Sequence, residues 1–242
     1  IFKMACLGLA VSGSSMIANA DPKLIPHRGA WKHYSNESAA ENSVTSYDRA
    51  EKQKVNGDYY VDYIEIDIRL LVIDSVKTPV VFHDKVFERL TNYNGDYDDW
   101  GKENFYSSDA LFETTSIATN ISRSKFDEID LRRMQKDGGS TLTNDELLTL
   151  TDFIDATVCK GGPKLILDLQ DFNTTKLSAD AIAAGSCPHG TKKHGTSYED
   201  LVYLKLFVAD TWPSTVSTKD SDARNAASGI MTFYGDSLTY IF

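Results

Sequence analysis

The stretch Tyr63-Ile64-Glu65-Ile66-Asp67-Ile68 alternates apolar and acidic side chains and carries much of the information about the fold. Side chains of a β-strand point alternately to two faces. The pattern therefore predicts a strand with isoleucines on one face and with Glu65 and Asp67 on the other. Carboxylates on a buried strand are costly unless each meets a cation, a basic side chain or water. Taken alone, the stretch favours ordinary solvated surface acids over a functional pair.

Strands and helices are expected to alternate on both sides of this stretch. Five further segments have the composition of strands and two have helical character. The expected strands span 23–26, 79–82, 164–169, 201–208 and 229–234, and the expected helices span 42–54 and 147–154. A capping box at Thr143–Glu146 is predicted to start the second helix. Strands separated by helices indicate an α/β fold with a parallel sheet, either open or closed into a barrel.

Composition excludes several classes of protein. The 242 residues are 41% hydrophobic and 25% charged, which is typical of a globular protein with a core and not of a disordered chain. The net charge of −10 disfavours binding to nucleic acid. Collagen, coiled coils and integral membrane proteins are also excluded, the last because no apolar run reaches the roughly 20 residues that span a bilayer.

The first twenty residues have the order of a secretory signal peptide. Lys3 precedes the apolar stretch Met4–Val11, and the small residues Ala18-Asn19-Ala20 end just before Asp21. We therefore expect residues 1–20 to be removed and the protein to be secreted or periplasmic; a hydrophobic N-terminal helix is the alternative. Because the chain begins with Ile1 and not with Met, we expect the sequence to be incomplete upstream.

Two cysteines follow this segment, Cys159 and Cys187. In an exported protein such a pair suggests a disulfide, and the alternative is two free, buried thiols. A zinc site is disfavoured because the sequence contains neither a CxxC nor an HExxH spacing.

Acidic and histidine side chains recur at the expected strands. Asp168 lies in the apolar strand 164–169, so Glu65, Asp67 and Asp168 on neighbouring strands would form an oxygen-rich site for Ca²⁺ or Mg²⁺. His27 and His83 each follow a short apolar strand. A lone histidine is usually structural, but two beside a carboxylate cluster suggest an acid and a base. Together with the planar cation of Arg28, which directly follows His27, these groups predict a phosphoryl-transfer site.

An ordered set of short motifs resembles the glycerophosphodiester phosphodiesterase family, whose patterns are HRG, PENT, ExD and HD in that order. The matching segments are His27-Arg28-Gly29, Ala40-Glu41-Asn42-Ser43, Glu65-x-Asp67 and His83-Asp84, followed by Glu88-Arg89-Leu90-Thr91 and Ser140–Glu146. Each motif alone is weak, whereas their order and spacing over residues 24–169 are specific.

The resemblance implies a TIM (β/α)8-type barrel of the phospholipase C-like phosphodiesterase superfamily, with its site at the C-terminal ends of the strands. It implies hydrolysis of glycerophosphodiesters to glycerol 3-phosphate and an alcohol, with a divalent metal, Ca²⁺ or Mg²⁺. His27 and His83 correspond to the catalytic pair, and Glu65 and Asp67 to metal ligands. Asp168 stands where the family has a glutamate ligand.

Further positions of the family are only partly matched. Gln170 replaces a lysine of the family, and Ala40 replaces a proline. Arg28, Glu41 and Asn42 are expected to bind substrate or shape its site. Capping of the following helix is the alternative for Asn42.

A barrel needs eight strands, and about six are evident before Phe242. We therefore expect residues 21–242 to form one barrel domain that is truncated at its C-terminus, with a shortened barrel as the alternative. A polar, aromatic insertion at about 92–125 is expected after the third strand, where it would cover part of the site.

Two other functions remain open from the sequence. One is a phospholipase D-like or phosphatidylinositol-cleaving lipase of the same fold, with peripheral membrane contact through the aromatic side chains of the insertion. The other is a non-catalytic barrel that binds phosphate esters or a partner protein. His189 and His194 are expected to be solvated, and Lys192 and Lys193 are candidates for attracting an anionic substrate.

Overall fold

The computed structural model describes residues 25–30, 39–52, 54–55, 58–59, 61, 63–84, 87, 90–92, 120–134, 140–169, 172–206, 232–233 and 240–241. The expected signal peptide, Gln170 and residues 93–119 of the expected insertion lie outside these ranges. The strands are β1 (Ile25–Pro26), β2 (Lys54–Val55), β3 (Asp58–Tyr59), β4 (Tyr63–Ile73), β5 (Val76–Val81), β6 (Asn120–Ile121), β7 (Asp130–Met134), β8 (Ser140–Glu146), β9 (Lys164–Leu169), β10 (Val202–Leu206), β11 (Thr232–Phe233) and β12 (Tyr240–Ile241). The helices are α1 (Val44–Glu51), α2 (Arg123–Phe126), α3 (Leu150–Ala156) and α4 (Phe172–Ala184), with 3₁₀ turns η2 (Val158–Lys160) and η3 (Tyr198–Asp200).

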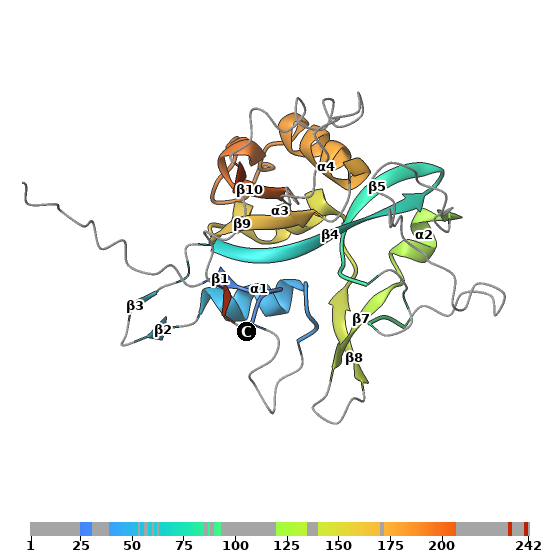
Figure 1. Cartoon of the computed structure of the whole chain (residues 1–242), viewed down its shortest axis with the longest axis horizontal. Helices are drawn as coiled ribbons and strands as arrows, with labels where there is room; N and C mark the ends of the chain where they lie inside the picture. The colour runs from blue at the N-terminus through green and yellow to red at the C-terminus, as the bar shows by residue number, and fades with distance from the viewer. Residues whose placement is uncertain are drawn as a thin grey trace, which may run out of the picture.

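A six-stranded sheet forms the centre of the fold, with β4 and β9 running through its middle (Figure 1). The strand order is β11-β10-β9-β4-β5, and β6 pairs with the far end of β4. β4, β6, β9, β10 and β11 are parallel, as expected. β5 is antiparallel to β4, so the sheet is mixed and the expectation of a wholly parallel sheet is wrong at this strand.

β5 runs antiparallel to β4 because β4 does not end at Ile68, where the alternation of apolar and acidic residues stops. β4 continues to Ile73 and pairs with β5 in a hairpin whose turn is Asp74-Ser75. Both turn residues have positive φ, 47° and 66°, which matches the twist of a tight two-residue hairpin. β6 and α2 occupy residues 120–126, so the end of the expected insertion belongs to the sheet.

The first strand lies beside the last described strand. β1 pairs in parallel with β12, with Ile25 opposite Tyr240, and a bridge between His27 and Glu65 joins the end of β1 to β4. Parallel strands therefore follow one another in the order β12-β1-β4-β9-β10-β11. No pairing of β11 with β12 occurs among the described residues, so the observed architecture is an α/β fold without a closed barrel.

The two faces of β4 have opposite characters, as the alternating sequence predicts. Ile64, Ile66 and Ile68 pack with apolar residues of β9, α3 and α4 in the largest core cluster. On the opposite face, register places Glu65 beside Ile166 and Asp67 beside Asp168. This second face is therefore apolar near the start of the strands and acidic towards their ends.

Side-chain capping differs from the sequence prediction. Residues 140–146 form β8, in which buried and exposed side chains alternate, so the predicted capping box at Thr143–Glu146 is wrong. The N-cap of α3 is Thr149, whose hydroxyl accepts a hydrogen bond from the Asp152 amide. A reciprocal capping box is present in α1, where Ser43 and Ser46 satisfy each other's backbone amides.

Cys159 and Cys187 form a disulfide, with Cα atoms 5.4 Å apart, at the end of the main core cluster. The bond joins η2 to the loop after α4. No helix within the described ranges has the length and apolar character needed to cross a membrane.

Candidate active site

The turn after β1 brings His27 and Arg28 to the acidic face of β4. Arg28 adopts the left-handed conformation with φ of 56°, and its backbone amide donates to Glu65 Oε2 at 2.9 Å. Its carbonyl accepts from the Asn42 amide and from the Ser46 hydroxyl, both at 3.1 Å. Three groups from three segments, the Glu65 carboxylate, the Asn42 amide and the Ser46 hydroxyl, thus hold a backbone conformation that an arginine rarely adopts.

Gly29 completes this turn. A Cβ atom at Gly29 would lie 2.5 Å from Ser46 Oγ, and its φ is 76°. The turn therefore needs a glycine both for its conformation and for its contact with α1.

Three carboxylates converge on the acidic face. Oxygen atoms of Glu65, Asp67 and Asp168 lie within 4.8 Å of one another. Glu65 and Asp67 are almost fully buried, at 0% and 1% exposure, and Asp168 is partly buried. An all-oxygen donor set of this kind fits a hard divalent cation such as Ca²⁺ or Mg²⁺.

Basic and amide groups surround Asp67. Arg28 Nε lies 2.8 Å from Asp67 Oδ2, and Arg28 Nη1 lies 3.3 Å from Glu41 Oε2. Asn42 makes two hydrogen bonds with Asp67: its Nδ2 donates to Oδ2, and its Oδ1 accepts from the Asp67 amide, both at 3.0 Å. The N-cap of α1 is Ser43 and not Asn42, so the capping alternative for Asn42 is wrong.

Burial dominates the electrostatics of Asp67. It raises the pKa of the carboxyl above its ordinary value, and the nearby Asp168 raises it further. Arg28, His83 and the Asn42 hydrogen bond oppose this shift by stabilising the charged form. A divalent cation beside the three carboxylates would act in the same direction as these opposing groups.

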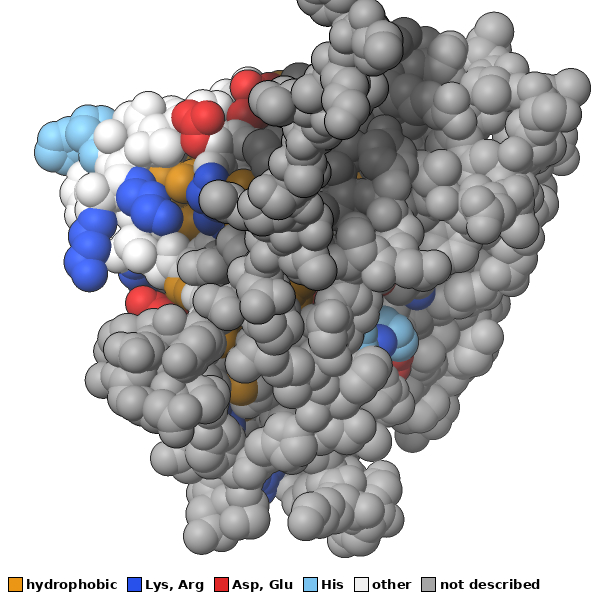
Figure 2. Space-filling view, turned by 60° about the vertical axis from the view of Figure 1, so that its left-hand side comes forward, with side chains coloured by type: hydrophobic (Ala, Val, Ile, Leu, Met, Phe, Trp, Pro, Cys, Tyr) orange, Lys and Arg blue, Asp and Glu red, His pale blue; other side chains and the backbone are white. Residues whose placement is uncertain are grey.

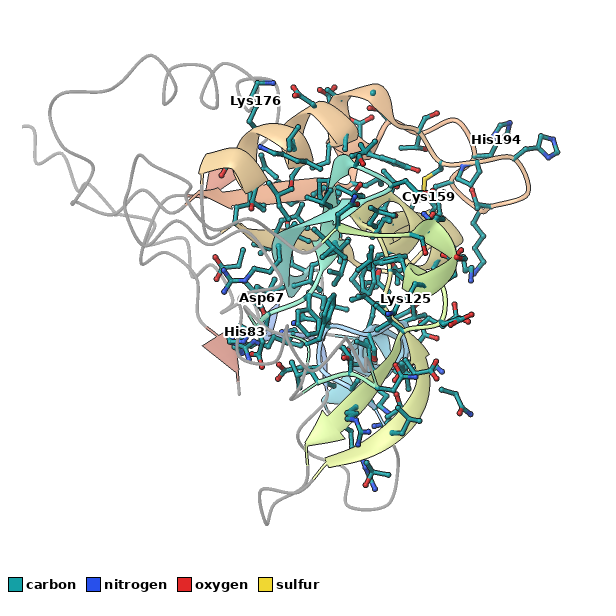
Figure 3. The ribbon with its side chains drawn as sticks, turned by 90° about the vertical axis from the view of Figure 1, so that its right-hand side faces the viewer. Asp67, His83, Lys125, Cys159, Lys176 and His194 are labelled. Carbon is teal, nitrogen blue, oxygen red and sulfur yellow. A yellow bond between two sulfur atoms is a disulfide. The ribbon has the colours of Figure 1, made fainter. Side chains whose placement is uncertain are left out.

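Each histidine lies near one of the carboxylates of β4. His27 Nε2 is 3.9 Å from Glu65 Oε1, and His27 is partly exposed. His83 follows β5, its Nδ1 lies 2.7 Å from Asp84 Oδ1, and Arg69 Nε donates to its carbonyl at 2.8 Å. Figure 3 shows Asp67 and His83 at the same end of the sheet. Glu41, His83 and Asp84 form a second group whose ligand atoms lie within 4.8 Å of one another.

The structure therefore gathers every site residue that the sequence analysis named: His27, Arg28, Glu41, Asn42, Glu65, Asp67, His83 and Asp168. Residues that the analysis missed include Ser46, Arg69 and Asp145. Their contacts are made across long separations in sequence, except for those of Ser46 with Ser43. Asp84 was quoted as the second residue of the His83-Asp84 motif, but no role was assigned to it from the sequence.

The basic loop after α4 does not join the site. Lys193 Nζ donates to the Gly162 carbonyl at 3.1 Å, just before the start of β9, whereas Asp168 lies near the end of that strand. In Figure 3, His194 lies on the side of the molecule away from Asp67. Basic side chains also gather beside apolar ones on one face in the space-filling view (Figure 2). The placement gives no support to Lys192 and Lys193 as groups that draw substrate into the site.

A comparison with protein families assigns the chain. The glycerophosphoryl diester phosphodiesterase family matches residues 27–226. The chain belongs to this family. The resemblance inferred from the motifs is confirmed, and the match extends well beyond the last of them.

Solved structures of the same kind are similar to the chain at low sequence identity. Two are glycerophosphodiester phosphodiesterases. The one from Agrobacterium tumefaciens is 18% identical, with 87% of this chain and 65% of that chain covered and a TM-score of 0.48. The one from Parabacteroides distasonis is 18% identical, with 88% and 64% covered and a TM-score of 0.49.

A third similar structure is an Oleispira antarctica phosphodiesterase in complex with the product sn-glycerol-3-phosphate. It is 15% identical, with 88% of this chain and 65% of that chain covered and a TM-score of 0.45. The chain thus spans slightly less than two thirds of the length of each of the three structures. No curated protein matched the sequence.

Proposed function

We propose that this protein is a metal-dependent phosphodiesterase that hydrolyses glycerophosphodiesters to glycerol 3-phosphate and an alcohol. The observation that carries the proposal is the convergence of Glu65, Asp67 and Asp168 beside His27 and His83. Family membership supports the choice of substrate class. The other members of the site fit the same chemistry, since Arg28 supplies a permanent cation of the geometry that phosphate binds.

Glu65, Asp67 and Asp168 would hold the divalent cation. When bound, it would neutralise charge on the phosphate and polarise a phosphoryl oxygen. Arg28 is held at Asp67 and Glu41, within the same cluster, and would contribute a second positive charge towards the phosphate.

The histidines would move the protons. One of His27 and His83 accepts the proton of the attacking hydroxyl, from water or from the glycerol moiety itself, while the other protonates the alcohol that leaves. The new P–O bond and the broken one lie on opposite sides of the phosphorus, so the reaction needs two groups that transfer protons, and the histidines near Glu65 and Asp67 would supply them. The contact of Asp84 with Nδ1 of His83 would leave Nε2 as the nitrogen that exchanges a proton with substrate.

Three further proposals complete this function. Residues 21–242 would form one barrel domain of the phospholipase C-like superfamily, which the parallel strand order and the β1–β12 pair support. The protein would be exported, as its first twenty residues suggest. Its partner would be a small phosphodiester and not nucleic acid. The lipase alternative rests on aromatic residues of 93–106, which lie outside the described residues.

Hydrolysis of glycerophosphocholine tests the proposal. Release of glycerol 3-phosphate is measured with Ca²⁺, with Mg²⁺ and with EDTA, for the wild type and for His27→Ala, His83→Ala and Glu65→Gln. His194→Ala is the matched control, because it removes an exposed histidine remote from the site. We expect loss of activity in EDTA and a fall in kcat of about 10²-fold or more for each site variant. Equal activity of His27→Ala and His194→Ala, or full activity in EDTA, would contradict the assignment.

A further inference from the structure

The segment Ala39–Ser43 carries two side chains into the site without belonging to a helix or strand. Glu41 contacts Arg28, and the side chain of Asn42 makes two hydrogen bonds with Asp67. Asn42 also has φ of 57°, a conformation that a free chain visits rarely. The positions of Glu41 and Asn42 therefore depend on whatever fixes this short segment from outside.

The carboxylate of Asp145, on β8, accepts hydrogen bonds from residues on both sides of Glu41 and Asn42. Its Oδ2 accepts from the Ala40 amide at 3.2 Å, and its Oδ1 accepts from the Thr45 hydroxyl at 2.5 Å. The carboxylate is 8% exposed and comes from a part of the chain 105 and 100 residues away from these partners. One oxygen thus holds the backbone just before Glu41, and the other holds a side chain that follows Asn42.

Asp145 is itself fixed by the β7–β8 hairpin. Its amide donates to Thr143 Oγ1 at 3.1 Å, and the Thr143 hydroxyl donates to the Leu131 carbonyl at 2.7 Å. The hairpin projects from the sheet beside β5 (Figure 1), and the backbone bond from Leu147 to Ile129 closes its base. The carboxylate is therefore presented from a supported strand and not from a loop.

Starting helix α1 does not require Asp145. Ser43 and Ser46 already satisfy the first amides of α1 through their capping box. The bonds made by Asp145 fall outside that box, on Ala40 and on the Thr45 side chain. What they fix is the path of the chain through Glu41 and Asn42.

We propose that Asp145 is a positioning residue, which sets the places of Glu41 and Asn42 and through them those of Arg28 and Asp67. The expected effect on catalysis rests on the proposed function. The hydrogen bonds by which Asp145 holds the segment do not depend on that function. Without the carboxylate, the two bonds to the segment are lost, and Asn42 is no longer held where its amide meets Asp67. Its carboxylate binds Ala40 and Thr45 and is not among the grouped acidic side chains of the candidate site.

A double-mutant cycle with Asn42 tests the effect on catalysis. We expect Asp145→Ala to lower kcat/KM by about 10²-fold, the size of effect that a misplacement of 1 Å produces. In an Asn42→Ala background the same change is expected to cost much less, because the positioned group is already gone. Thr45→Val removes one of the two hydrogen bonds of Asp145, so its kcat/KM should lie between those of the wild type and of Asp145→Ala. Asp152→Asn is the control, since Asp152 contacts the cap of α3 and does not reach the site.

Hydrogen exchange of the metal-free protein tests, without an activity assay, whether Asp145 holds the segment Ala39–Ser43. Asp145→Ala should speed exchange of the amides of Ala40 and Asn42, while Asp152→Asn should leave them unchanged. Unchanged exchange in Asp145→Ala would overturn the proposal, as would an equal loss of kcat/KM with and without Asn42. If the wild type lacks turnover, the proposed function fails, and the exchange experiment alone still decides whether Asp145 holds the segment.

Discussion

Replacing Asn42 by alanine removes the two hydrogen bonds that fix Asp67 in a region with almost no water. Asn42 is 3% exposed and Asp67 is 1% exposed. A bond to a charged group is worth about 1.5–3 kcal/mol, and leaving the buried Asp67 amide unsatisfied costs about 1–3 kcal/mol. An alanine in the left-handed conformation adds about 1 kcal/mol. We therefore expect Asn42→Ala to lower the free energy of unfolding by about 3.5–7 kcal/mol.

Urea denaturation followed by circular dichroism in EDTA measures this loss without a cation at the site. Asn42→Gly is the matched comparison, because it removes the same hydrogen bonds but tolerates positive φ. The backbone cost of the left-handed conformation should therefore be smaller for Asn42→Gly than for Asn42→Ala. The loss should grow as pH rises through the raised pKa of Asp67, since removing the amide donor raises that pKa further and charging the carboxyl becomes costlier in the variant. A loss below about 1 kcal/mol at pH 7 would refute the account of how Asp67 is held.

Three further changes have expected outcomes. Burial raises the pKa of the Tyr47 phenol, so the unfolded chain loses this proton first and stability should fall above about pH 10; Tyr47→Phe should flatten that fall in urea titrations at pH 7, 9 and 11. Reducing the Cys159–Cys187 disulfide, which closes a separation of 28 residues, should cost about 3–4 kcal/mol of unfolding free energy, and no change in melting temperature would contradict this. Gly29→Ala should destabilise the turn through its clash with Ser46 and its positive φ; unchanged thermal unfolding would show that α1 can shift.

Alternation of Ile64, Glu65, Ile66 and Asp67 was enough to predict both faces of the central strand. The apolar run at 164–169 predicted a neighbouring strand that carries Asp168, and the register of β4 with β9 puts Asp168 opposite Asp67. These predictions succeeded because period-two alternation is a local property that burial enforces along the whole strand.

The hairpin and the helix caps were missed for a different reason. Leu70 to Ile73 is continuously apolar, so the sequence does not reveal that the strand continues, and Asp74-Ser75 lacks the glycine that usually marks such a turn. The pattern Thr143-x-x-Glu146 satisfies the local rule for a capping box, but pairing with β7 makes it a strand. Tertiary pairing overrode local preference at both places.

Site residues that act through others left almost no trace in the sequence. The contacts of Asp145 with Ala40 and Thr45, and of Arg69 with the carbonyl of His83, depend on which strands the fold brings together. Asn42 was named through a motif, but its role as a support of Asp67 emerges only from the two hydrogen bonds between them.

The parallel pair of β1 with β12 has a consequence for how the molecule forms. Ile25, among the first described residues, lies opposite Tyr240, among the last. Such a contact closes a loop of nearly the whole chain, and contacts of this range slow folding because the entropy of closure is lost before the pairing stabilises it. During synthesis, the strand that leads into His27 would gain this partner only after β12 has been made. The turn at His27–Gly29 would therefore be among the last parts of the described structure to form.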